Sequence, residues 1–168
     1  MNSLPPNAPG FSFKTRVTSS WANIELLRQA VIASARAVFD DETSVSIGTV
    51  ASELMENAVK YGVWEGAAVQ TMRVAVRGRE KTIEVEVEAP SSAEACAELD
   101  RHLAWIRSFP SAEHAYQARI LELTTSPPDK RSSMGLVRIA VEGPCAIESE
   151  LTADSLLVVR AHHDTSSA

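Results

Sequence analysis

The sequence predicts a single α+β domain, a two-layer sandwich in which helices cover one face of a mixed, mostly antiparallel sheet. Two neighbouring segments, 71–78 and 81–90, alternate apolar and polar residues with the period of a β-strand. Segments with apolar residues at helical spacing precede and follow them, and a length of 168 residues suits one domain. We expect this domain to span 11–162, between short tails at 1–10 and 163–168.

The N-terminal part predicts one strand and two helices. FSFKTRVT (11–18) alternates as a strand does, and the run at 21–39 carries apolar residues at helical spacing. A second helix is expected to begin at a cap formed by Thr43 or Ser44 and to end near Tyr61.

The two alternating segments predict a hairpin that closes around Arg79 and Glu80. In that register Arg73 lies opposite Glu86 on a charged face. The other face is apolar, with Met72, Val74 and Val76 opposite Val87, Val85 and Ile83. A sheet with one apolar and one charged face is covered by helices on one side only.

The C-terminal part predicts more helices and a closing hairpin. Two helices at 93–109 and 112–123 are followed by a loop, SPPDKRSS (126–133). A short helix at 134–143 precedes the last two strands, which are expected at 145–152 and 155–162.

Composition excludes several classes of protein. The net charge of −6, without a cluster of Lys and Arg, argues against nucleic-acid binding. No apolar run approaches the ~18 residues of a membrane span. Cys96 and Cys145 lack the spacing of a zinc site, so we expect reduced thiols in a cytoplasmic protein. The four histidines lack metal-ligand spacing and are expected on the surface.

One stretch, SELMENAVKYG (52–62), carries polar residues that fit either a helix surface or a site. On a helix, Glu53, Asn57 and Lys60 fall along one edge beside the apolar arc. An amide oxygen suits Mg²⁺, a lysine neutralises phosphate and a carboxylate can orient a nucleophile. Glu56 and Lys60, in turn, form the i,i+4 pair of an ordinary solvated helix. The spacing alone leaves both interpretations open.

A wider resemblance favours the site. ASELMENAVKYG resembles the N-box of the histidine-kinase-like ATPase (GHKL) superfamily, E-x-x-x-N followed by a basic residue. SSMGLVRIAVEG (132–143) resembles its G2 box, and the similarity covers roughly 11–161. The anti-sigma-factor serine-kinase branch is similar in length. The two-helix insert at 93–123 resembles that of the SiaB-like kinase-like proteins.

The resemblance implies a role for each matching residue. Glu53 would act as base or orient the attacking group, Asn57 would bind Mg²⁺ and Lys60 would contact the phosphate of ATP. In the G2 box, the implied phosphate contacts are Ser132, Ser133 and Gly135.

The G1 box, an aspartate followed by spaced glycines, is absent. After TIEVEVE the chain continues as APSSAEA, and Glu88 is the one acidic residue near the place of the aspartate. Pro90 supplies no backbone N–H there. Losing the adenine contact weakens ATP binding, because a buried polar recognition group is hard to replace.

Two functions follow from this partial pattern. The first is a bacterial regulatory protein that acts mainly through protein contacts, like an anti-sigma factor, with ATP binding weakened or lost. Its partner would be a STAS-domain antagonist or a sigma factor, or a second copy in a homodimer. The alternative is an active Mg-ATP-dependent kinase that phosphorylates a serine of a STAS-domain-type partner.

Overall fold

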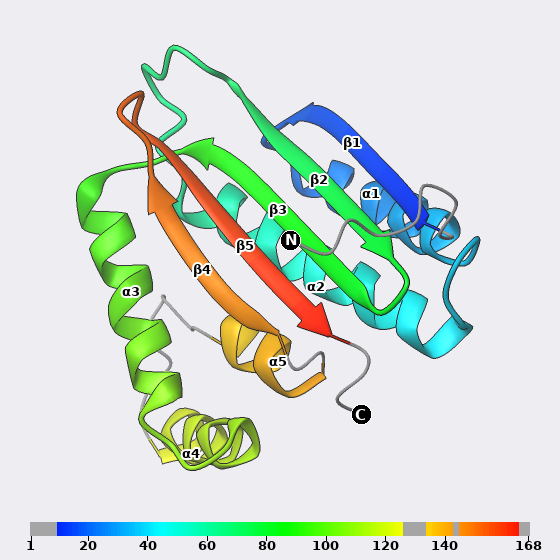
Figure 1. The fold of residues 1–168 in the computed structure, drawn as a ribbon. Coiled ribbons are helices and arrows are strands. Elements are labelled where there is room, and N and C mark those ends of the chain that lie inside the picture. Colours follow the sequence, from blue (N-terminus) through cyan, green and yellow to red (C-terminus); the bar gives the residue numbers. More distant parts are fainter. Residues whose placement is uncertain (1–9, 126–133, 143–144, 165–168) are drawn as a thin grey trace, which may run out of the picture.

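A computed structural model describes residues 10–125, 134–142 and 145–164. It contains five helices and a five-stranded sheet, in the order β1-α1-α2-β2-β3-α3-α4-α5-β4-β5. Figure 1 shows one face of the sheet toward the viewer, with α1, α2 and α5 behind it, α3 beside β4 and α4 at the lower end of α3. The predicted α+β class is confirmed.

The sheet has the order β1-β2-β3-β5-β4. Every pairing among the described strands is antiparallel, so the parallel pair that a mixed sheet would contain is not seen there. The strands are β1 (Gly10–Thr18), β2 (Thr71–Arg79), β3 (Thr82–Pro90), β4 (Ala146–Leu151) and β5 (Leu156–Asp164).

The predicted register of the β2–β3 hairpin is wrong by two residues. Gly78 pairs with Ile83, and Arg73 pairs with Glu88 instead of Glu86. The strands continue to the tip and close in a two-residue turn, whose first residue, Glu80, adopts a φ of 52°. Because side chains alternate with a period of two, this shift leaves every residue on its predicted face.

The helices are α1 (Trp21–Ala35), α2 (Asp41–Tyr61), α3 (Ala93–Arg107), α4 (Ala112–Thr125) and α5 (Met134–Glu142). The predicted cap of α2 at Thr43 or Ser44 is wrong. Asp40 caps the helix, and its carboxylate accepts a hydrogen bond of 2.8 Å from the backbone N–H of Thr43. The Ser44 hydroxyl instead donates to the Asp40 carbonyl at 2.7 Å, inside the first turn.

The predicted loop at 126–133 lies outside the described residues. The predicted C-terminal tail began too early, because β5 runs to Asp164 and two residues assigned to the tail belong to this strand. Within the described part of the chain, no helix is long and apolar enough to cross a membrane.

The core lies between the sheet and the helices. Its fully buried side chains come from α1, α2, α5 and the central strands, and they include Val31, Met55, Met72, Val85 and Ile139. Helix α2 packs on β2 and β3, and α5 packs against α2. This packing brings the second half of α2, which carries SELMENAVKYG, to the boundary between the core and α5.

Candidate functional site

A pocket lies beside the second half of α2, between α2, α3, α5, β3 and β5. The volume open to the centre of a water molecule is about 80 Å³, several times the ~10–15 Å³ that one water needs. Most of its described lining is apolar. The apolar side chains include Leu54, Val87, Leu99, Leu136, Leu157 and Val159.

Asn57, for which the resemblance implies Mg²⁺ binding, lines this pocket. Its Nδ2 is buried and has no hydrogen-bond partner among the described residues, and the same holds for the hydroxyl of Tyr61, one turn further along α2. An unpartnered buried donor costs roughly 1–3 kcal/mol, so these two donors would gain from a ligand or an ordered water.

Lys60 lies apart from the pocket. Its side chain is exposed, and its Nζ lies 5.0 Å from the centroid of the Tyr61 ring, a cation–π contact. The N-box resemblance links Asn57 and Lys60, but of these two residues only Asn57 lines the pocket.

Glu53 faces a different hollow from Asn57, although the two residues are one turn apart. Its carboxylate accepts a hydrogen bond of 2.7 Å from Arg138 of α5 and is only 11% exposed. Glu53, Glu56 and Arg138 line a second, more open pocket between α1, α2 and α5. Burial, followed by the charge of Glu53, raises the pKa of the Glu56 carboxyl.

Gly135 supports this arrangement and does not line the Asn57 pocket. It lies in the first turn of α5, where a Cβ atom would be 2.4 Å from Oε2 of Glu53. The glycine thus lets α5 approach the Glu53 carboxylate closely. Ser132 and Ser133, the other predicted G2-box contacts, lie outside the described residues.

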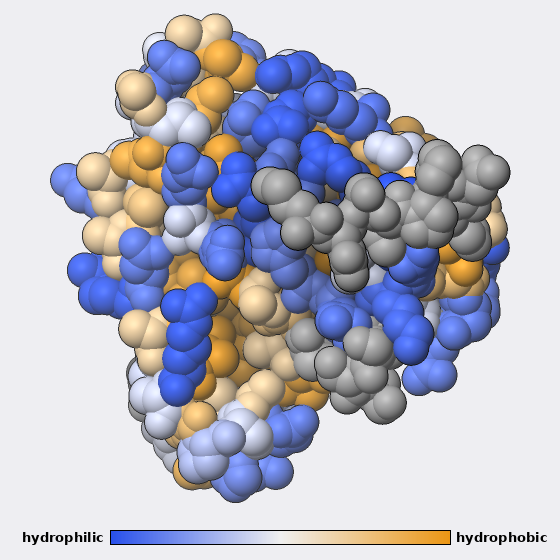
Figure 2. All heavy atoms as spheres, in the orientation of Figure 1, coloured by the Kyte–Doolittle hydropathy of each residue, from blue (hydrophilic) through white to orange (hydrophobic). Residues whose placement is uncertain are grey.

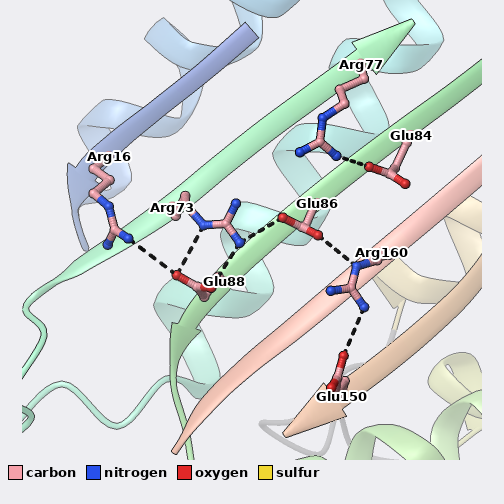
Figure 3. A network of polar contacts seen from close by, with 8 residues as sticks. All are labelled: Arg16, Arg73, Arg77, Glu84, Glu86, Glu88, Glu150 and Arg160. Atoms are coloured by element: carbon pink, nitrogen blue, oxygen red, sulfur yellow. Dashed lines mark hydrogen bonds and ion pairs between the residues drawn. The ribbon is translucent and has the colours of Figure 1, made fainter. Parts of the chain in front are cut away.

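Glu88 lies on the opposite face of the sheet from Asn57. Its neighbours Val87 and Ala89 line the pocket, so strand alternation turns Glu88 away from it. Its carboxylate lies 2.9 Å from Arg73 and 3.7 Å from Arg16 (Figure 3). The structure therefore does not bring Glu88 together with Asn57.

The open face of the sheet carries a network of ion pairs (Figure 3). Arg73 lies between Glu86 (2.8 Å) and Glu88, while Arg160 bonds both Glu86 (2.7 Å) and Glu150 (3.2 Å). Burial opposes the charged form of Glu86, but the hydrogen bond from Arg160 and the charge of Arg73 outweigh it. The pKa of Glu86 is therefore lowered. In Figure 2 this face is mainly hydrophilic over β2 and β3, with more apolar residues toward α3 and α4.

Sequence reasoning missed several residues of both pockets. Ser91, Glu98 and His102 line the Asn57 pocket, although His102 had been assigned to a helix surface. Burial lowers the pKa of His102. Arg138 could have been singled out from the sequence, because it is the one charged residue in the apolar run MGLVRIAV. No group of three metal-ligating side chains occurs in the described residues.

The chain is an α+β domain that shares its fold with a solved structure. A chain in the crystal structure of the SiaB–SiaC complex from Pseudomonas aeruginosa superposes with a TM-score of 0.64. The match covers 90% of this chain and 88% of that chain at 17% sequence identity, so the similarity is one of fold. No protein-family model matches the sequence, and no curated protein matches it significantly.

Proposed function

We propose that this protein is a cytoplasmic regulatory protein that acts mainly through contacts with other proteins, in the manner of an anti-sigma-factor-like switch, and that its ATP site is weakened or lost. The observation that carries the proposal is the lining of the Asn57 pocket. Its described wall is largely apolar and includes no Lys or Arg. A triphosphate bound there would lose water without gaining a cation from the described wall, which is strongly unfavourable.

Helix α3 supports the loss of an adenine site. It begins at Ala93, directly after β3, with Ser92 as its N-cap. Pro90, Ala95 and Leu99 from this region form part of the pocket wall. In the GHKL pattern, this position holds an aspartate and a flexible glycine turn, and here a capped helix occupies it.

The contacts of Glu53 also favour a regulatory protein over an enzyme. A base must be free to reach the proton that it removes. Glu53 is instead held by Arg138 and covered by Gly135. Its carboxylate therefore has a structural use that explains its presence without catalysis.

The structural neighbour supports a protein partner, because that structure is a complex of two proteins, SiaB and SiaC. The resemblance to the anti-sigma-factor branch makes a STAS-domain antagonist or a sigma factor the partner of the present chain in this proposal, and a homodimer is the other arrangement that the proposal allows.

Light scattering after size-exclusion chromatography tests the protein contacts. The protein would be mixed with a STAS-domain protein from the same organism, with and without Mg-ATP. A complex that forms equally well without nucleotide is expected. A complex that requires Mg-ATP would contradict the proposal. So would a protein that stays monomeric and binds no STAS-domain or sigma-factor candidate.

One observation favours the alternative, a serine kinase. Asn57 lines the pocket, and a carboxamide supplies the oxygen that Mg²⁺ takes as a ligand. Glu53 would then need to leave Arg138 to act as base. Mass spectrometry of the partner after incubation with Mg-ATP tests this: phosphorylation that is abolished by Glu53→Gln would support the kinase.

A further inference from the structure

We propose that the pocket beside Asn57 binds a neutral, mainly apolar small molecule that carries hydrogen-bond acceptors. The proposal does not depend on the identity of the protein partner. It assigns a ligand class to a pocket for which the nucleotide was the expected occupant.

The first argument is a set of polar side chains without partners. Asn57, Tyr61, Ser91 and His102 all line the pocket. None of their side chains makes a hydrogen bond to any residue that the structure describes, and two donors, Asn57 Nδ2 and the Tyr61 hydroxyl, are buried. They come from α2, the end of β3 and α3, so they converge on one space from three directions. Convergent polar groups in an apolar pocket are typical of small-molecule sites.

The second argument is charge. Glu98 is the one charged residue in the described lining, and it is negative. An anionic ligand would be desolvated beside a carboxylate, with no Lys or Arg in the described lining to compensate. Burial lowers the pKa of His102, so that its imidazole is neutral at pH 7 and offers a hydrogen bond but no positive charge. The lining therefore selects a neutral ligand over a phosphate or a carboxylate.

The third argument is the room left by small residues. Ala58, Ala89 and Ala95 lie in the pocket wall among larger aliphatic side chains. A void lined by aliphatic groups forgoes packing contacts, whereas an apolar ligand body restores them. The body of the ligand would rest on these aliphatic groups, and its acceptors would reach Asn57, Tyr61 and Ser91.

Nuclear magnetic resonance with two matched probes tests the proposal. Benzamide presents a neutral ring with an amide acceptor, and benzoate presents the same ring with a negative charge. Benzamide is expected to shift the backbone amide signals of residues in the pocket wall, such as Ser91 and Leu99, with saturation in the millimolar range. Benzoate is expected to bind at least tenfold more weakly. Equal binding of benzoate, or no shifts with benzamide, would overturn the proposal.

A pair of variants on α3 tests whether benzamide binds in this pocket. Ala95 lies in the pocket wall, whereas Ala97 is exposed on the same helix. Ala95→Phe is expected to fill the pocket and abolish the benzamide shifts, while Ala97→Phe leaves them unchanged. Asn57→Ala is expected to weaken binding about tenfold, through the loss of one hydrogen bond. Benzamide shifts that survive Ala95→Phe would locate the binding elsewhere and overturn the assignment.

Discussion

At the scale of single residues, the main finding concerns Glu53 and Asn57, which lie one turn apart on α2 and face different hollows. Asn57 lines the apolar pocket, and Glu53 points to α5 and Arg138. The spacing of the two residues correctly predicts that they share one helix. It could not predict their separation, because the partner of Glu53 is 85 residues away in the sequence.

The Glu53–Arg138 pair is expected to stabilise the fold. In a double-mutant cycle with Glu53→Gln and Arg138→Gln, we expect a coupling of about 1 kcal/mol, because Glu53 is buried but Arg138 is half exposed. Urea denaturation of the four proteins measures it. The exposed pair Glu25–Arg28 is the control and should give a smaller coupling. A coupling near zero for Glu53–Arg138 would mean that Arg138 of α5 does not hold the Glu53 carboxylate.

Glu86 is expected to make the free energy of unfolding depend on pH in the acidic range. Its pKa is lowered from 4.5 in the folded state, so its contribution is fully present above pH 4.5 and is lost as pH falls toward the folded pKa. Glu86→Gln should cost about 2 kcal/mol at pH 7, through the lost hydrogen bonds from Arg73 and Arg160. Below pH 4.5 the variant should lose less stability than the wild type.

Thermal unfolding monitored by circular dichroism between pH 7 and pH 3 measures this difference. Glu148→Gln is the control, because Glu148 is an exposed carboxylate on β4 without an ion pair to any residue in the described part of the chain. Parallel stability curves for the wild type and Glu86→Gln would contradict the assignment.

At the scale of the elements, the close approach of α1 and α2 depends on one glycine. A Cβ atom at Gly48 would lie 2.4 Å from Cγ1 and 2.8 Å from Cδ1 of Ile32. Ile32 is buried, so its side chain cannot swing into solvent. The two helices therefore pack at a distance that the glycine sets.

The effect of Gly48→Ala is expected to change sign with its neighbour. In the wild type, the clash with Ile32 should destabilise the protein by about 1–3 kcal/mol. In an Ile32→Ala background the clash is gone, and the better helix propensity of alanine should stabilise by about 0.5–1 kcal/mol. Urea denaturation of the four proteins measures both values. The same sign in both backgrounds would show that the helices do not meet at this point.

The elements were predictable to the extent that local pattern defines them. All five strands and five helices coincide with segments that periodicity indicates. The hairpin register was wrong because it depends on the turn at Glu80 and Lys81, which carries neither the glycine nor the asparagine that marks such turns. The predicted cap of α2 was wrong because three residues that can cap a helix, Asp40, Thr43 and Ser44, lie within five positions of one another.

At the scale of the whole molecule, the fold was predicted from element order and the pocket was not. The pocket requires that α3, α5 and the second half of α2 meet over β3 and β5, and these segments are far apart in the chain. The sequence indicated that the glycine turn after β3 is absent. Only the packing reveals that α3 contributes a wall in that region and leaves an apolar hollow.

The similarity in fold to a chain of the SiaB–SiaC complex, at 17% identity, carries no residue-level evidence about nucleotide binding. The central proposal, that ATP binding by this protein is weakened or lost, therefore depends on the pocket itself.

Isothermal titration calorimetry with Mg-ATP tests that claim most directly, with the wild type and Asn57→Ala measured side by side. The described lining around Asn57, which is largely apolar and includes no Lys or Arg, predicts no detectable heat of binding at millimolar nucleotide for either protein. Micromolar binding by the wild type that is lost in Asn57→Ala would contradict the account and identify Asn57 as part of a working nucleotide site.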